Sequence, residues 1–94
     1  MNDTVNIEFN EKNGNFNINN EGRKVALMTF VFADPDKIII DHTEVSPVFN
    51  GKGLGKKLIE KAVEVARQKK WTIIPLCPFA KKTFEKNPEY NDVL

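Results

Sequence analysis

The chain has 94 residues, with 14 Lys or Arg against 13 Asp or Glu, which gives a net charge of +1. This length fits one domain, residues 1–94, and an apolar fraction of 40% is that of a soluble globular protein. The near-neutral charge gives no bulk electrostatic basis for binding nucleic acid, and no apolar run approaches the roughly 18 residues that span a bilayer.

Residues 1–4 lack the basic and apolar segments of a signal peptide, so the cytoplasm is the expected compartment. The single cysteine, Cys77, excludes an internal disulfide. Cys77 and His42 together supply too few soft ligands for a structural zinc site, so no metal site is expected.

Four extended segments are predicted in the first half of the chain. Residues 5–9 alternate apolar with polar side chains, residues 12–15 supply a turn, and the alternation resumes at residues 16–18, which predicts a β-hairpin. Residues 23–32 are apolar on both faces, so a central strand covered on both sides is expected. Residues 37–45 form the fourth extended run, and the turns between these runs predict an antiparallel meander.

A long helix is predicted from Leu54 to Lys69, where the apolar spacing changes from two to about 3.6. Residues 71–76 read as a fifth strand, and its pairing should weaken near its end because Pro75 lacks a backbone donor. Pro78 suits the first position of a short second helix that ends near residues 87–88 and has Cys77 at or near its N-cap. Residues 89–94 carry no strong signal.

These elements predict an α+β fold with a mixed sheet: four antiparallel strands, a glycine turn, a long helix, a fifth strand and a short helix. The crossover through the long helix makes the fifth strand parallel to the fourth. Because the helix begins at the end of the fourth strand, beside a strand weakened by proline, a notch for a long, thin ligand is expected there.

Residues 50–55, Asn-Gly-Lys-Gly-Leu-Gly, are predicted to form a phosphate cradle. Glycines allow a tight turn that brings backbone N–H groups close to an anion, and the following helix start adds unpaired N–H groups and its positive dipole end. Lys52, Lys56 and Lys57 add positive charge. A plain strand-to-helix turn is the alternative, and the spacing matches neither a P-loop nor a dinucleotide fingerprint.

From residue 41 to residue 90 the sequence resembles the GNAT superfamily, the acetyl-coenzyme A-dependent N-acetyltransferases. Residues 50–55 match both glycine positions of the superfamily's pyrophosphate loop, Gln/Arg-x-x-Gly-x-Gly/Ala. Residues 42–45 (His-Thr-Glu-Val), 74–79 (Ile-Pro-Leu-Cys-Pro-Phe) and 87–90 (Asn-Pro-Glu-Tyr) resemble a subfamily of short GNAT-like proteins.

The resemblance implies acetyl-coenzyme A, or coenzyme A, as co-substrate. Loop amides would hold its pyrophosphate, and the backbone near Val45 would pair with its pantetheine arm. The coenzyme-binding residues that it implies are Val45, Asn50, Gly51, Lys52, Gly53, Leu54, Gly55 and Lys56. It also implies an acetyl acceptor, which can be an amine, a peptide or a small molecule, and leaves the oligomeric state open.

The chain departs from the superfamily pattern in four ways. Asn50 stands where the motif prefers Gln or Arg. There is no counterpart of the helix pair that longer relatives insert after their first strand, nor of their last two strands, which usually form the acceptor wall. The superfamily commonly has an Asn, an Ala three residues on and a Tyr seven residues on, which can protonate the leaving thiolate; this chain has Cys77, Ala80 and Phe84.

Cys77 is the candidate nucleophile, because a helix N-cap would stabilise its thiolate; a buried structural cysteine is the alternative. Strand alternation groups His42 with Ile38, Ile40 and Glu44. If the fifth strand lies beside the fourth, His42 could act as the base for Cys77; the alternative is a hydrogen-bonded strand histidine.

Three further positions have a functional and a structural interpretation. Glu44 is either a general base or a solvated strand residue, and Tyr90 either replaces the missing phenol or packs near the chain end. Lys81, Lys82 and Lys86 either meet the coenzyme's 3′-phosphate or form a solvated helix face, and the solvated face is the default.

Two hypotheses of function follow. The first is acetyl transfer, either direct or through an acetyl-Cys77 intermediate, with a backbone N–H near Val45 stabilising the oxyanion. The second is a module that binds coenzyme A or a partner without catalysis, as the missing acceptor wall would allow. Nucleic-acid binding through the loop lysines is disfavoured by the near-neutral charge.

Overall fold

The computed structural model describes residues 4–94, and its five strands form one sheet in the order β1-β2-β3-β4-β5. The strands are β1 (Val5–Phe9), β2 (Asn13–Asn20), β3 (Arg23–Asp34), β4 (Lys37–Val45) and β5 (Thr72–Pro75). Strands β1 to β4 pair antiparallel in sequence order, whereas β4 and β5 are parallel. The predicted hairpin, meander and parallel crossover are confirmed.

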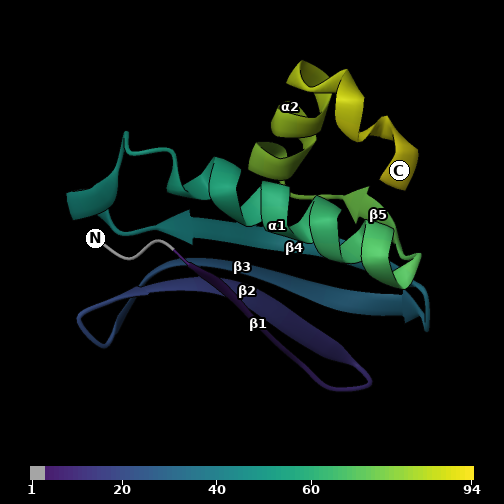
Figure 1. Cartoon of the computed structure of the whole chain (residues 1–94), viewed down its shortest axis with the longest axis horizontal. Helices are drawn as coiled ribbons and strands as arrows, with labels where there is room; N and C mark the ends of the chain where they lie inside the picture. The colour runs from purple at the N-terminus through teal and green to yellow at the C-terminus, as the bar shows by residue number, and fades with distance from the viewer. Residues whose placement is uncertain (1–3) are drawn as a thin grey trace.

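Two helices and two 3₁₀ turns complete the chain. After β4 come η1 (Pro47–Phe49) and α1 (Leu54–Lys69), and after β5 come α2 (Pro78–Lys86) and η2 (Pro88–Val93). Figure 1 shows α1 lying across one face of the sheet, with α2 and η2 beside β5. The predicted bounds of the long helix are confirmed, while η2 forms in a segment for which no regular structure was predicted. No helix within residues 4–94 combines the length and apolar composition needed to cross a membrane.

The core lies between α1 and the face of the sheet that it covers. Apolar side chains at helical spacing on α1 pack onto apolar side chains that alternate along β2, β3 and β4. Large, fully buried side chains among them are those of Phe16, Ile18, Met28, Phe30, Ile38, Ile40, Leu54, Leu58, Ile59 and Val63. The amphipathic pattern of the sequence therefore defines one helix-on-sheet core.

The opposite face of the sheet is only partly covered. Leu27 and Thr29 of β3 are half-buried, and Val31 is 37% exposed. The expectation that β3 is covered on both sides is therefore wrong. The physical reason is that the one crossover helix, α1, lies on a single face, so the apolar residues on the other face of β3 are covered only by neighbouring side chains.

A β-bulge interrupts β4 at Asp41. Phe30 of β3 pairs with Ile40, and the preceding Thr29 pairs with His42, so Asp41 has no opposite residue. The side chain of Asp41 instead accepts a hydrogen bond of 2.7 Å from Thr29 Oγ1. Because one extra residue reverses the inward and outward alternation, every side chain after the bulge changes face.

The bulge decides which residues of β4 meet the core. Thr43 pairs with Met28, which faces α1, whereas His42 and Glu44 lie on the open face, with side chains 61% and 65% exposed. The expectation that His42 shares a face with Ile38 and Ile40 is therefore wrong, because simple alternation does not survive the extra residue.

Strands β4 and β5 separate after Ile40 and Pro75. The ladder ends at that pair, and the N–H groups of Leu76 and Cys77 both donate to the Ile40 carbonyl oxygen, each at 3.0 Å. The weakened pairing predicted from Pro75 is thus confirmed. It leaves the last residues of β4 without a β5 partner, next to the start of α1.

Candidate functional site

The loop between η1 and α1 has a backbone that depends on glycine. Gly51 and Gly53 have φ angles of +82° and +75°, in the left-handed region that side chains with a Cβ adopt reluctantly. The amides of Asn50 and Lys52 donate to the carbonyl oxygens of Pro47 and Phe49, each at 3.3 Å. These two hydrogen bonds hold the loop in a tight turn. They leave its remaining N–H groups available to other acceptors.

Several backbone N–H groups of this loop have no acceptor within residues 4–94. The first helical amide that is bonded is that of Lys57, which donates to Gly53 O at 3.2 Å. The unpaired amides are those of Gly51, Gly53, Leu54, Gly55 and Lys56. No acidic residue occupies the first turn of α1, so the positive dipole end is uncompensated. This arrangement is suited to an anion.

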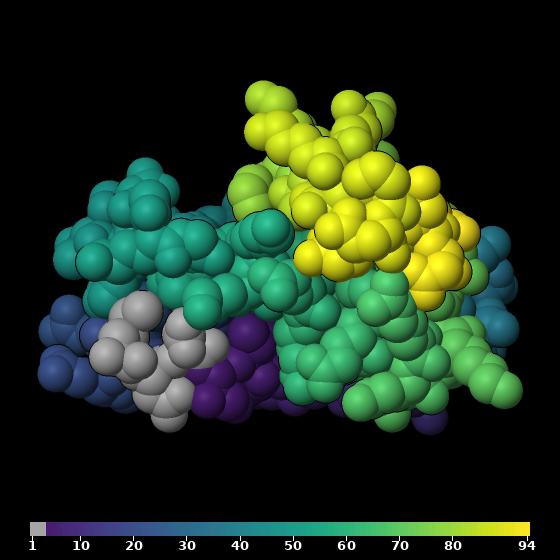
Figure 2. All heavy atoms as spheres, turned by 45° about the horizontal axis from the view of Figure 1, so that its top comes forward, coloured from purple at the N-terminus to yellow at the C-terminus, as the bar shows by residue number. Residues whose placement is uncertain are grey.

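A cavity of about 420 Å³ opens beside these amides. Figure 2 shows a hollow between the loop with the start of α1, in teal, and α2 with η2, in yellow-green to yellow. The lining residues are Val45, Phe49, Asn50, Gly51, Gly53, Leu54, Gly55, Lys56, Phe79, Thr83, Lys86 and Asn87. Seven of the eight residues implied to bind a coenzyme are among them; the exception, Lys52, is exposed outside the lining.

The cavity is positively charged. Lys56 of α1 and Lys86 of α2 contribute its two charged side chains, and no Asp or Glu lines it. Neither ammonium forms an ion pair with a carboxylate in the described part of the chain. Two uncompensated cations next to a helix N-terminus favour a ligand with more than one negative charge.

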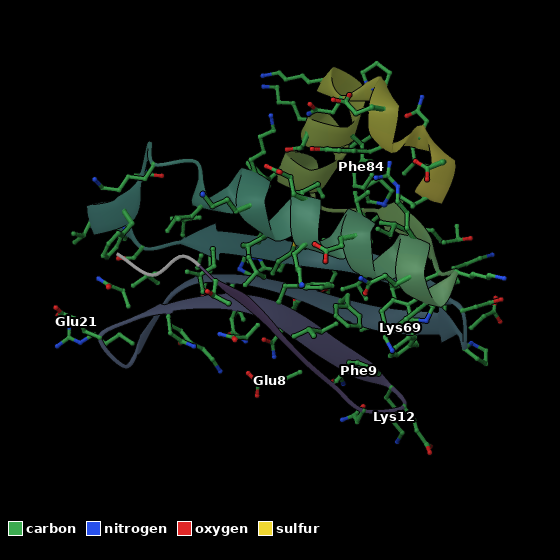
Figure 3. All side chains as sticks on the ribbon, viewed as in Figure 1. Glu8, Phe9, Lys12, Glu21, Lys69 and Phe84 are labelled. Carbon is green, nitrogen blue, oxygen red and sulfur yellow. The ribbon has the colours of Figure 1, made fainter. Side chains whose placement is uncertain are left out.

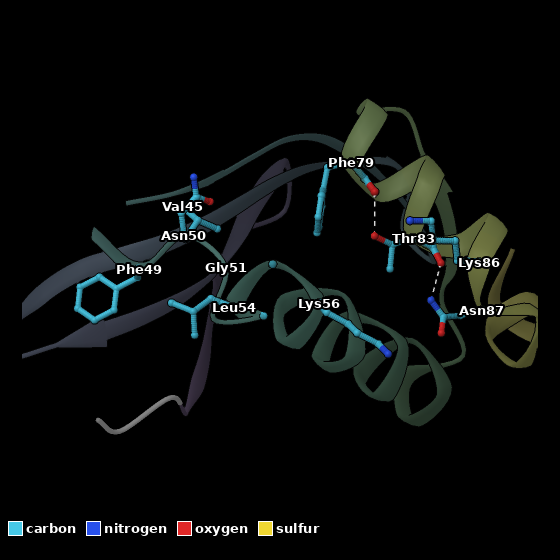
Figure 4. Close-up of a pocket in the computed structure, with 12 residues that line it drawn as sticks. Val45, Phe49, Asn50, Gly51, Leu54, Lys56, Phe79, Thr83, Lys86 and Asn87 are labelled. Carbon is cyan, nitrogen blue, oxygen red and sulfur yellow. Dashed lines mark hydrogen bonds between the residues drawn. The ribbon is translucent and has the colours of Figure 1, made fainter. Parts of the chain in front are cut away.

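The wall opposite the loop comes from one stripe of α2. Phe79, Thr83 and Lys86 follow one another at helical spacing, and Asn87 lies beside them (Figure 4). Thr83 Oγ1 donates to Phe79 O at 2.9 Å, and Asn87 Nδ2 donates to Thr83 O at 2.7 Å. Of this wall, sequence reasoning considered only Lys86 and missed Phe79, Thr83 and Asn87, although the 3.6-residue period of α2 could have indicated which residues share its face.

The ring of Phe79 lies against Gly55. A Cβ added at Gly55 would stand 2.5 Å from Phe79 Cζ, closer than carbon atoms pack. Figure 4 shows the ring reaching from α2 toward the loop. Gly55 has an ordinary helical φ, so glycine is required here for close approach of the two helices and not for backbone conformation.

Cys77 is the N-cap of α2, as predicted. Its Sγ accepts a hydrogen bond from the Ala80 N–H at 3.3 Å, and Thr43 Oγ1 lies 3.3 Å from the same sulfur. The side chain is 6% exposed. The sulfur therefore sits where β4 and β5 separate, held from the β4 side by the residue that the bulge turns inward.

The structure does not bring His42 and Cys77 together. His42 Nε2 lies 3.4 Å from Glu44 Oε2 on the open face, and no hydrogen bond joins the ring to Cys77 in residues 4–94. The expected base–thiol pair is absent because the bulge places Thr43, not His42, beside the sulfur. His42 and Glu44 instead form an exposed pair of their own.

The expected phenol position is apolar and buried. Phe84 is 3% exposed, and the ring of Tyr90 packs on it with a centroid separation of 6.0 Å. Burial, assisted by the nearby carboxylates of Glu60 and Glu89, raises the pKa of Tyr90 above its ordinary value. Tyr90 does not line the cavity, so its role is packing in this structure.

Comparisons with known proteins agree with this architecture. A family model described as GCN5-related N-acetyl-transferase matches residues 15–93. An NMR structure of a GCN5-like protein from Staphylococcus aureus is 42% identical, with a TM-score of 0.72 over 94% of this chain and 85% of that one. A search of curated proteins found no match.

Two longer proteins share the fold at lower identity. A ribosomal-protein-alanine N-acetyltransferase from Brucella melitensis is 22% identical, with a TM-score of 0.65 over 83% of this chain and 62% of its own. An IAA acetyltransferase from Bacillus cereus is 20% identical, with a TM-score of 0.60 over 80% of this chain and 53% of its own. The chain thus spans less than two thirds of either protein, and these two likenesses concern the fold alone.

Proposed function

Because the chain belongs to the family of GCN5-related N-acetyltransferases, we propose that it binds acetyl-coenzyme A and transfers the acetyl group to an acceptor. One observation carries the proposal: the cavity joins five unpaired amides, the N-terminus of α1 and two uncompensated lysines. A pyrophosphate has the negative charge and the acceptor oxygens that such a surface can satisfy.

The rest of the ligand would lie along the gap between β4 and β5. Val45 lines the cavity at the end of β4, and Cys77 lies where the two strands part. With the pyrophosphate on the loop, the pantetheine arm would run along the unpaired end of β4, so that the thioester arrives near Thr43 and Cys77. The backbone near Val45 would then hold the arm and stabilise the carbonyl oxygen.

The finer proposal is a route through acetyl-Cys77. The sulfur of Cys77 attacks the thioester carbonyl carbon, the carbon–sulfur bond of the thioester breaks, and coenzyme A leaves as a thiol that takes the Cys77 proton. The acceptor amine then attacks the acetyl carbon, the bond between that carbon and Cys77 Sγ breaks, and Cys77 regains a proton from the amine. The Ala80 N–H and Thr43 hydroxyl beside Sγ support this route, because both can stabilise a thiolate.

Intact-mass spectrometry tests this route on the whole chain after incubation with acetyl-coenzyme A. The route predicts an added acetyl group that is missing in Cys77→Ala, together with lost turnover in that variant. His42→Ala serves as the matched control, because His42 does not contact the sulfur, and should keep the acetylated species. Unimpaired turnover in Cys77→Ala without an acetylated wild type contradicts the covalent route and leaves direct transfer.

The transfer itself is tested with a panel of amines, peptides and small molecules. Acetylated product from any of them supports an enzyme. Saturable binding of acetyl-coenzyme A without product from any acceptor contradicts transfer and supports a coenzyme-binding module. The buried Phe84 at the usual phenol position is the feature that favours this second function, because it cannot protonate a leaving thiolate.

A further inference from the structure

We infer that Lys86 makes this chain selective for the 3′-phosphate of coenzyme A. The inference rests on the proposed function and adds a specificity residue to it. Coenzyme A carries a pyrophosphate and, on its ribose, a separate phosphomonoester that 3′-dephospho-coenzyme A lacks. A cavity that recognises both groups needs two cationic sites, and this cavity has two.

The first cationic site is the start of α1. The unpaired amides of Leu54, Gly55 and Lys56 and the Lys56 side chain belong to the first turn of α1, directly after the loop amides of Gly51 and Gly53, so one anionic group can bind them together. Once a pyrophosphate lies there, its charge is compensated by that turn.

The second cationic site is Lys86, which belongs to the last turn of α2 and lines the opposite wall of the cavity. Thr83 and Asn87 line the same wall, but Thr83 Oγ1 and Asn87 Nδ2 each already donate a hydrogen bond to a carbonyl oxygen of α2. The Lys86 ammonium is therefore the charged donor of this wall, and no carboxylate of residues 4–94 pairs with it. A phosphomonoester is the group of coenzyme A that satisfies it.

The neighbouring lysines of α2 differ from Lys86. Lys81 and Lys82 are exposed and do not line the cavity, so the solvated-face interpretation suits them. Lys81 thus provides a matched control: its removal takes the same charge from the same helix without touching the cavity wall.

The test measures dissociation constants of coenzyme A and of 3′-dephospho-coenzyme A by calorimetry, at one ionic strength, for wild type, Lys86→Ala and Lys81→Ala. Wild type should bind coenzyme A about fivefold more tightly than the dephospho form, as expected for a phosphate paired with an exposed ammonium. Lys86→Ala should abolish that preference by weakening the binding of coenzyme A more than that of the dephospho form, whereas Lys81→Ala should keep the preference.

Three results overturn the inference while the proposed function stands: equal wild-type affinities, a preference that survives in Lys86→Ala, or a preference lost equally in Lys81→Ala. If neither ligand binds wild type, the proposed function itself fails, and the inference falls with it. A preference that shrinks when salt is raised from about 0.05 M to about 0.5 M supports an ionic contact at the exposed Lys86.

Discussion

The two ends of α1 differ in how their polar groups are used. At the N-terminal end, the amides of Leu54, Gly55 and Lys56 have no acceptor within residues 4–94. At the other end, the charged groups of Arg67 and Lys69 have partners within the chain. Unsatisfied groups lie where a ligand can bind, and satisfied groups lie where they hold the fold together.

The C-terminal end of α1 joins the sheet and the chain terminus. Figure 3 shows Phe9 and Lys69 near one another, and the Lys69 ammonium lies 5.6 Å from the Phe9 ring and 5.7 Å from the Trp71 ring. Trp71 also packs edge-on against Phe32, with centroids 5.3 Å apart. Arg67 binds both carboxylate oxygens of Asp92, at 2.8 and 2.9 Å, which fixes η2 on α1.

The largest expected effect comes from disrupting the aromatic contacts at the C-terminal end of α1. Trp71→Ala should lower the free energy of unfolding by about 3–5 kcal/mol, because Trp71 is only 9% exposed and loss of its ring leaves a cavity. Urea denaturation measures the loss, and the folded fraction should keep its affinity for acetyl-coenzyme A. A loss below about 1 kcal/mol, or a weakened affinity of the folded protein, contradicts the division between the two ends.

A second variant disrupts the glycine loop at the N-terminal end of α1. Gly53→Val should weaken binding of acetyl-coenzyme A at least about thirtyfold, because a β-branched residue avoids the φ of +75° that positions the loop amides. Calorimetry gives the change in affinity.

The matched control for this variant is Gly22→Val. Gly22 has a φ of +80°, and an added Cβ meets nothing within 4 Å at either glycine, so both substitutions strain the backbone alike. Gly22 lies in the turn between β2 and β3, away from the cavity lining, so this variant should lose stability but keep its affinity. Equal losses of affinity in the two variants would exclude a specific role for the loop.

A third change sharpens the contact between α1 and α2. Gly55→Ala should cost stability while Phe79 is present, since the new Cβ would lie 2.5 Å from the ring. In a Phe79→Ala background the same change should stabilise by about 0.5–1 kcal/mol, because alanine favours a helix over glycine. A double-mutant cycle in urea measures the coupling; additive effects would mean that the ring does not press on Gly55.

The smallest effect concerns Asp92 and depends on pH. The hydrogen bond from Arg67 holds the pKa of Asp92 below its ordinary value of 3.8. Because this pKa is depressed in the folded state, the stabilisation is complete above the unfolded value and is lost as the pH falls through the folded value. The melting temperature of Asp92→Asn should therefore lie below that of wild type at neutral pH, and the gap should close below pH 3.8. A gap independent of pH would contradict the ionic contact.

Local patterns in the sequence predicted much of the fold and part of the site. The 3.6-residue period gave the bounds of α1, Pro75 indicated the separation of β4 from β5, and Pro78 indicated that Cys77 is an N-cap. The alternating glycines indicated the loop. Each of these signals depends on residues close together in the chain.

What the sequence did not predict depends on partners far along the chain. The bulge at Asp41 is defined by pairing with β3, and it reversed the expected face of His42. The turn η2 is held by Arg67, which lies 25 positions before Asp92. Lys86 reaches the cavity only because the crossover brings α2 beside the start of α1. Local sequence patterns do not indicate contacts between residues that lie far apart in the chain.

The most direct test of the account is a titration with acetyl-coenzyme A, followed through the backbone amide signals by NMR. The account predicts saturable shifts that are largest at the unpaired amides of Gly51, Gly53, Leu54, Gly55 and Lys56, and small at the aromatic end around Trp71. Silent loop amides, or shifts centred on Trp71, would contradict it.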